Sequence, residues 1–272
     1  MDLMSYFNEL SGHKESPSRV LRAPFSYHGG KAKSLSHLLR IIPYRNSYIE
    51  VFGGSAALLL ARKPSVLDVY NDRFGGVVCF YRCLRDRAKC DKLLEWMKAS
   101  VHSREEFFEG WKDQTDEIER AARWYYTTMF SFAKTGTSFG RSTDSLNPLP
   151  AAIRRHYPDF LEAHLRLRDV LIENRDWRTM FRDFDSPTAV IYCDPPYLES
   201  EQKYEHKMPL ADHIELCEII MRSVGYVALS GRSACCDIYD NYDWTAREEW
   251  LVNDVGSTTT RAPVKEFLWI KE

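Results

Sequence analysis

Short apolar runs alternate with longer amphipathic stretches through most of this 272-residue chain. The runs have the length and the β-branched content of buried strands. Strands that alternate with helices are typical of an α/β protein with a doubly wound parallel sheet. We therefore predict strands over five segments: 48–52, 66–70, 170–173, 189–193 and 226–230.

The remaining periodic segments complete this α/β pattern. Residues 55–62, 74–84 and 210–223 have the apolar spacing of helices. Residues 245–252 and 266–270 indicate a closing hairpin, which is often antiparallel in such sheets. We predict a single sheet, and the alternation of strands and helices that forms it is broken once along the chain.

The interruption is the segment 100–168, which is helical in pattern and rich in aromatic residues. Between residues 121 and 168 there are seven basic and three acidic residues, although the whole chain has a net charge of −2. Such an excess indicates either a surface that meets phosphates or a solvated helical face. We predict three parts: a polar arm at 1–24, a sheet domain at 25–99 and 169–272, and an insertion at 100–168.

Composition narrows the class of protein. Hydrophobic content of 44% and charged content of 28% are ordinary for a globular domain. The seven cysteines lack paired C-x-x-C spacing, although Cys79 and Cys83 lie one helical turn apart, so we expect reduced, buried thiols and no metal. No segment has the length of a membrane span or the pattern of a signal peptide, and no heptad is visible. We expect a soluble, cytoplasmic monomer.

The predicted strand 189–193 ends abruptly at Asp194, Pro195, Pro196 and Tyr197. This sequence places a carboxylate, a backbone carbonyl and an aromatic ring at the mouth of the sheet. Two acceptors and a ring can hold a planar base by its exocyclic amine. The alternative is a proline turn with no further function.

A glycine turn follows the first predicted strand, in the segment 50–55. Gly53 and Gly54 let a ligand approach the backbone, and Asp72 lies 19 residues after Gly53, where such sheets bind ribose hydroxyls. The G-x-G-x-x-G pattern of dinucleotide sites is missing, which favours a nucleoside cofactor without a pyrophosphate. The alternative is a plain turn.

Two further segments contain candidate ligand groups. Asp176 and Trp177 follow the predicted strand 170–173, where the carboxylate can accept from an adenine amine and the ring can cover it. A helix cap beside a core tryptophan is the alternative. Tyr27 and Lys31 flank two glycines before a helix, but the spacing differs from a phosphate loop, so we do not expect nucleoside triphosphate binding.

Taken in order, the segments YHGGK, EVFGGSAALLL, VYND, ENRDW and DPPY resemble the Dam family of adenine-N6 DNA methyltransferases. The match is to the alpha motif order, in the bacterial and phage subset with an FGGSA turn, and it covers residues 25–270. The resemblance implies a Rossmann-like, S-adenosylmethionine-dependent methyltransferase sheet with an inserted, mainly helical target-recognition subdomain. It implies site-specific methylation of double-stranded DNA.

The resemblance also implies roles for single residues. Tyr27 and Lys31 would contact the methionine part of S-adenosylmethionine, and Asp72 would bind its ribose. Asp176 and Trp177 would bracket its adenine. The floor of the cofactor site would be formed by three residues: Phe52, Gly53 and Gly54.

The target adenine would flip out of the duplex onto Asp194, Pro195, Pro196 and Tyr197, and direct in-line transfer would follow. Residues 139–141 are similar to an FGR stretch in the family's DNA-contacting hairpin. That hairpin is shorter here than in members that read GATC, so the recognition sequence is not predicted. The expected DNA contacts are Lys134, Phe139, Arg141, Arg154 and Arg155.

Other functions remain open at this point. Cytosine-N4 methylation uses the same amine chemistry, although serine is commoner there at the position of Asp194. Methylation of RNA or of a protein glutamine is a further alternative. A catalytically idle module that binds DNA or the cofactor would fit the same fold, but the intact DPPY sequence, Asp72 and the glycine turn favour an enzyme.

Overall fold

The computed structural model describes residues 20–25, 27, 29–101, 103–131, 136–140, 148–198, 208–252 and 263–272. For residues 148–157 it describes the backbone helix alone. The predicted DNA contacts Lys134 and Arg141, and residues 1–19 of the predicted arm, lie outside this part of the chain.

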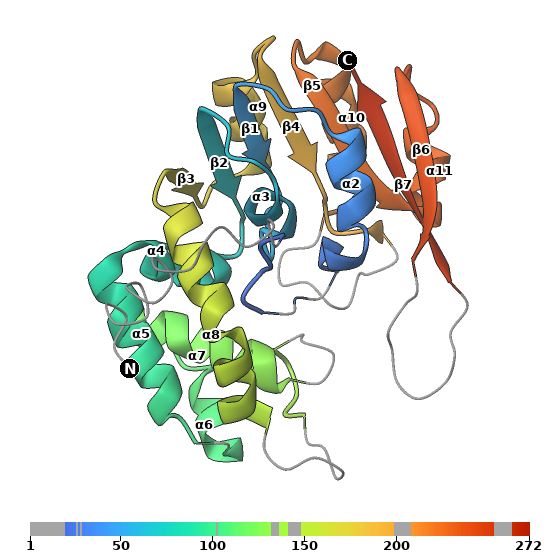
Figure 1. Cartoon of the computed structure of the whole chain (residues 1–272). Helices are drawn as coiled ribbons and strands as arrows, with labels where there is room; N and C mark the ends of the chain where they lie inside the picture. The colour runs from blue at the N-terminus through green and yellow to red at the C-terminus, as the bar shows by residue number, and fades with distance from the viewer. Residues whose placement is uncertain are drawn as a thin grey trace.

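The described residues form a seven-stranded sheet with the order β3-β2-β1-β4-β5-β7-β6 (Figure 1). The strands are β1 (Ser47–Glu50), β2 (Leu67–Asn71), β3 (Val170–Glu173), β4 (Ala189–Cys193), β5 (Tyr226–Arg232), β6 (Ala246–Val252) and β7 (Val264–Lys271). The first five are parallel, and β7 runs antiparallel to β5 and to β6. The predicted parallel sheet with an antiparallel closing hairpin is confirmed.

Helices cover both faces of this sheet. They are the 3-10 helix η1 (Lys31–Lys33), α2 (Leu35–Ile41), α3 (Ala57–Ala61), α4 (Gly75–Arg85), α5 (Arg87–Ala99), α6 (Arg104–Glu109), α7 (Glu117–Phe130), α8 (Pro148–Leu167), α9 (Trp177–Phe184), α10 (Leu210–Arg222) and α11 (Ser233–Tyr239). Side chains alternate along β4, so Tyr192 joins the core beneath α2, α3 and α4 while Cys193 joins the core beneath α9, α10 and α11. The sheet is therefore buried on both sides.

The predicted insertion is helical, but its core is continuous with the rest of the protein. Helices α4 to α8 gather beside the β3 end of the sheet (Figure 1). Phe80 of α4 stacks on Tyr125 of α7, with ring centroids 5.5 Å apart, and contacts Phe160 of α8 at 6.2 Å. Residues 100–168 therefore share a hydrophobic cluster with α4 and α5, and their assignment to target recognition stays a prediction.

A buried ion pair fastens the end of this helical group to the sheet. Arg166 of α8 lies 2.6 Å from the Asp68 carboxylate on β2, and their side chains are 8% and 3% exposed. The same guanidinium donates to the Leu59 carbonyl at 3.0 Å. A charge in such surroundings is costly to bury without an opposite charge beside it.

We expect Arg166→Met to lower the free energy of unfolding by about 3–5 kcal/mol, because it leaves Asp68 buried without a counter-charge. Urea denaturation measures this loss. The exposed neighbour Arg168 provides a control, since Arg168→Met should change stability by less than about 0.5 kcal/mol. Recovery in an Asp68→Asn/Arg166→Met double variant would support the pairing, and a small effect of Arg166→Met alone would contradict it.

Candidate active site

One cavity of about 990 Å³ opens at the carboxyl ends of the parallel strands. Open parallel sheets bind ligands at this edge because loops from several strands converge there. All twelve residues predicted to bind the cofactor or the target base line this cavity: Tyr27, Lys31, Phe52, Gly53, Gly54, Asp72, Asp176, Trp177, Asp194, Pro195, Pro196 and Tyr197. Segments far apart in the sequence therefore meet at a single site.

The glycine turn is shaped by its contacts with β2. A Cβ atom on Gly53 would lie 2.2 Å from the Tyr70 ring, and Gly54 has a φ of 47°. Only glycine fits the first position, and the second favours it. The Tyr70 hydroxyl donates to the Gly54 carbonyl at 2.8 Å, which fixes the turn against the sheet.

Asp72 organises the backbone on its side of the cavity. Its carboxylate accepts from the amide of Gly54 at 2.8 Å and from the amide of Phe74 at 2.7 Å. The first contact joins β2 to the glycine turn, and the second supports the start of α4. The residue predicted to bind ribose therefore also holds two loops in place.

Asp176 and Trp177 form the far wall. Asp176 is the N-cap of α9 and accepts from the amide of Arg178 at 3.1 Å. Trp177 is buried, its ring lies 6.4 Å from that of Phe52, and the Arg178 guanidinium lies over it at 4.4 Å. Asp176 is thus a helix cap beside a buried tryptophan, as the alternative interpretation of the sequence has it. Both residues also face the cavity.

Lys31 makes the central ion pair of the site. Its ammonium lies 2.7 Å from Oδ1 of Asp194 and donates to the Tyr197 hydroxyl at 2.6 Å. That hydroxyl donates in turn to the same Oδ1 at 3.0 Å. Lys31 is only 6% exposed and Asp194 16%, so the pair is largely shielded from water.

Glu266, on β7, reaches the site through Lys31, and sequence reasoning missed it. Its carboxylate lies 3.8 Å from the Lys31 ammonium, accepts from Ser34 at 3.4 Å and contacts Arg232 at 3.5 Å. The side chain is buried. In the sequence it stands beside Lys265 at the edge of an apolar run, a position that does not distinguish it from an exposed charge.

A second buried carboxyl, that of Glu50, lines the cavity at the end of β1. It accepts from the Tyr48 hydroxyl at 3.0 Å and from the Leu59 amide at 2.9 Å. Burial raises the pKa of Glu50 to about 8, although both hydrogen bonds oppose this shift. Burial at this position therefore favours the protonated form of the Glu50 carboxyl.

Burial also raises the pKa of Asp194 above its usual range. The Lys31 ammonium opposes this shift by favouring the carboxylate, and the nearby Glu266 charge adds to it. Asp194 has to be ionised to act as an acceptor. When the solution is acidified, activity that depends on Asp194 is therefore lost at a higher pH than it would be with an ordinary aspartate.

We expect the acid limb of the pH–rate profile to move in opposite directions in two variants. Lys31→Met removes the cation that lowers the pKa of Asp194, so the limb moves to higher pH. Glu266→Gln removes the charge that raises that pKa, so the limb moves to lower pH. Single-turnover rates at saturating cofactor measure both. Lys33→Met, at an exposed lysine of η1, should leave the limb in place, and a shift of the same sign in both test variants would refute this account.

The region that precedes the predicted hairpin also reaches the cavity. Trp111, Lys112 and Gln114, between α6 and α7, line it together with Gly136 and Thr137. Trp111 is 54% exposed and donates from its indole to the Gly136 carbonyl at 3.0 Å. The sequence did not indicate these residues, because a polar segment with one tryptophan looks like many ordinary surface loops.

Among the predicted DNA contacts, Phe139 has a side chain that the structure describes, and it does not line the cavity. Phe139 is half-buried, packs 5.4 Å from the Phe107 ring, and has the Arg104 guanidinium over it at 4.9 Å. Arg154 and Arg155 lie on α8 within its backbone-only segment. The five DNA contacts stay predictions.

Part of the basic excess in the insertion is neutralised within the fold. Arg123 pairs with Glu106 and Glu119, and Arg166 pairs with Asp68. Two of the seven basic residues counted there are thus committed to structural ion pairs. A phosphate-binding role has to rest on the others.

Comparison with known proteins identifies the family. The family model for D12 class N6 adenine-specific DNA methyltransferases matches residues 27–220, which is more than half of the chain. This chain is a member of that family. The prediction of an adenine-specific DNA methyltransferase, made from the order of the motifs, is confirmed.

A curated relative of this D12 methyltransferase is the Type II methyltransferase M.CviBI of Paramecium bursaria Chlorella virus NC1A. The two sequences are 21% identical over 230 residues, which cover 81% of this chain and 87% of that protein. The family acts on DNA with a methyl donor. Among the described residues of this member, no helix has the length and apolar character to cross a membrane.

Proposed function

We propose that this D12 methyltransferase transfers a methyl group from S-adenosylmethionine to N6 of an adenine that has flipped out of double-stranded DNA. The observation that carries this proposal is that the glycine turn with Asp72 and the segment Asp194–Tyr197 face the same cavity. A donor and an acceptor base bound there would lie next to each other. We further propose that the enzyme acts as a monomer in the cytoplasm.

The lining residues fit a nucleoside cofactor with an amino-acid tail. Asp72 and Asp176 offer carboxylates to hydroxyl and amine groups, and Trp177 offers a ring face. The Lys31 ammonium suits a carboxylate. Once bound, S-adenosylmethionine would supply a methyl group made electrophilic by its sulfonium.

The acceptor side has to make a poor nucleophile reactive. The lone pair of an aromatic amine is delocalised into the ring, which weakens its attack. If the amine donates to the Asp194 carboxylate and the Pro195 carbonyl, its nitrogen can become pyramidal and direct its lone pair out of the ring plane. Tyr197 would stack on the base and offset part of the cost of unstacking it, about a few kcal/mol.

Cys193, which adjoins this segment, is unsuited to covalent catalysis. Its side chain lies in the core beneath α9, α10 and α11, on the side of the strand opposite Tyr192. Burial raises the pKa of its thiol well above the usual range, so the reactive thiolate is disfavoured. This supports direct transfer over a thiolate mechanism.

The test is methylome sequencing of DNA from a methylation-deficient host that expresses the protein. We expect N6-methyladenine at one defined motif, and a loss of at least about 100-fold in transfer rate for Asp194→Ala, because a preorganised acceptor is removed. Calorimetry should show that this variant still binds S-adenosylmethionine.

The control is Asp237→Ala, which alters an exposed carboxylate on α11 and should retain full activity. N4-methylcytosine in place of N6-methyladenine would overturn the choice of base. Full activity of Asp194→Ala would overturn the assignment of this residue.

A further inference from the structure

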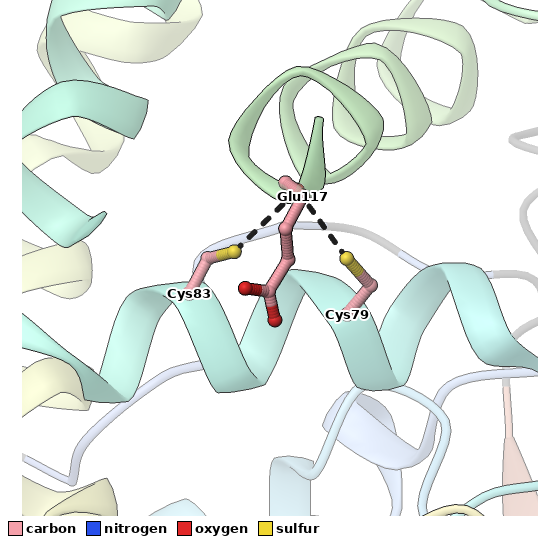
Figure 2. A group of neighbouring side chains, drawn as sticks. All are labelled: Cys79, Cys83 and Glu117. Carbon is pink, nitrogen blue, oxygen red and sulfur yellow. Dashed lines mark hydrogen bonds between the residues drawn. The ribbon is translucent and has the colours of Figure 1, made fainter. Parts of the chain in front are cut away.

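A cluster of two thiols and a carboxylate lies outside the cavity, between α4 and α7 (Figure 2). Cys79 and Cys83 stand one turn apart on α4, and Glu117 is the first residue of α7. Their two sulfur atoms and one carboxylate oxygen all lie within 4.8 Å of one another. Three potential ligand atoms from two helices thus converge on one point.

The surrounding fold holds both thiols in position. Cys79 is 2% exposed and Cys83 is fully buried, on a helix whose neighbouring residue Phe80 is packed in the aromatic core. Both sulfur atoms contact the backbone carbonyl of Glu117, at 3.4 and 3.6 Å. In Figure 2 the Glu117 carboxylate extends between the two sulfurs. The two thiols and the carboxylate therefore lie close together on a backbone that packing holds in place.

Charged neighbours complete the surroundings of the cluster. The Nε atom of Arg120 donates to the sulfur of Cys79 at 3.2 Å. A neighbouring arginine favours the thiolate, which is the form of cysteine that binds metals. Lys89 of α5 pairs with the Glu117 carboxylate, and its side chain is 40% exposed, so it can move into solvent when another cation takes its place.

We propose that Cys79, Cys83 and Glu117 form a binding site for a thiophilic divalent cation such as zinc. Two sulfur ligands select soft and borderline metals over magnesium or calcium, which require oxygen ligands. Binding releases one proton from each thiol and exchanges Lys89 for the metal at Glu117. A water molecule takes the fourth position of a tetrahedral site.

This site departs from the expectation of no metal, which rested on the lack of C-x-x-C spacing. Here the two cysteines are related by a helical turn, and the third ligand comes from a helix that begins 34 residues after Cys83. A bound cation would join α4 to α7. Both helices also line the cavity, through Gly76 and Trp124, which pack against each other. The site would therefore brace one wall of the cavity without taking part in transfer.

The test uses Cd²⁺ as the probe, titrated into the reduced full-length Cys236→Ser protein. This background removes the one partly exposed thiol, while the other six are buried. We expect one Cd²⁺ per chain by calorimetry, together with ultraviolet charge-transfer absorption from thiolate to metal. Cys79→Ser and Cys83→Ser should each weaken binding by at least about tenfold. Cys90→Ser, at a buried thiol on α5 outside the cluster, should bind Cd²⁺ as the background protein does.

Two variants at partly exposed positions keep the test decisive if a buried serine impairs folding. Glu117→Gln removes the carboxylate and should weaken Cd²⁺ binding. Lys89→Met removes the competing cation and should tighten it by up to about fivefold, the equivalent of an exposed ion pair. The proposal is overturned if the background protein shows no charge-transfer absorption, or if neither variant changes the affinity.

Discussion

A single buried ammonium, that of Lys31, joins three distant parts of the chain at the end of β4. It comes from a short helix near the N-terminal end of the described chain, and it lies 2.7 Å from Asp194 after β4 and 3.8 Å from Glu266 on β7. Each of these charges would be costly to bury alone. Their mutual compensation lets charged groups occupy the edge of an apolar sheet. The geometry at the end of β4 therefore depends on the antiparallel hairpin as well as on the parallel strands.

The parallel sheet explains why so many functional groups meet in one place. The segments after β1, β2, β3 and β4 all emerge at the same edge, with Gly53, Asp72, Asp176 and Asp194 respectively. The segments after β1 and β2 are joined directly, because the Asp72 carboxylate accepts a hydrogen bond from the glycine turn. A shift of the segment after β2 would therefore also move the glycine turn after β1.

Periodicity and motif order predicted the strands, the hairpin and the twelve cavity residues, because strand ends and glycine turns have strong local signals. β3 and β4 have the predicted bounds, whereas the predicted helix 55–62 contracts to Ala57–Ala61, because Ala56 takes a left-handed φ of 52°. Glu266 and the shared core of α4 with α7 were not predictable, because both depend on contacts between segments far apart in sequence. The Cys79–Glu117 cluster was missed for the same reason.

The contacts around Asp194 occupy the place that the proposed mechanism gives to the substrate amine. Lys31 and Tyr197 both donate to Oδ1 of this carboxylate, which is the kind of contact that an exocyclic amine makes. Under the proposed mechanism, a base that uses this oxygen would compete with an ammonium ion, which is a strong charged donor. Weakly held or poorly aligned bases would then be rejected before any chemistry begins. Selectivity would be obtained through competition with the protein's own side chains, at the expense of affinity.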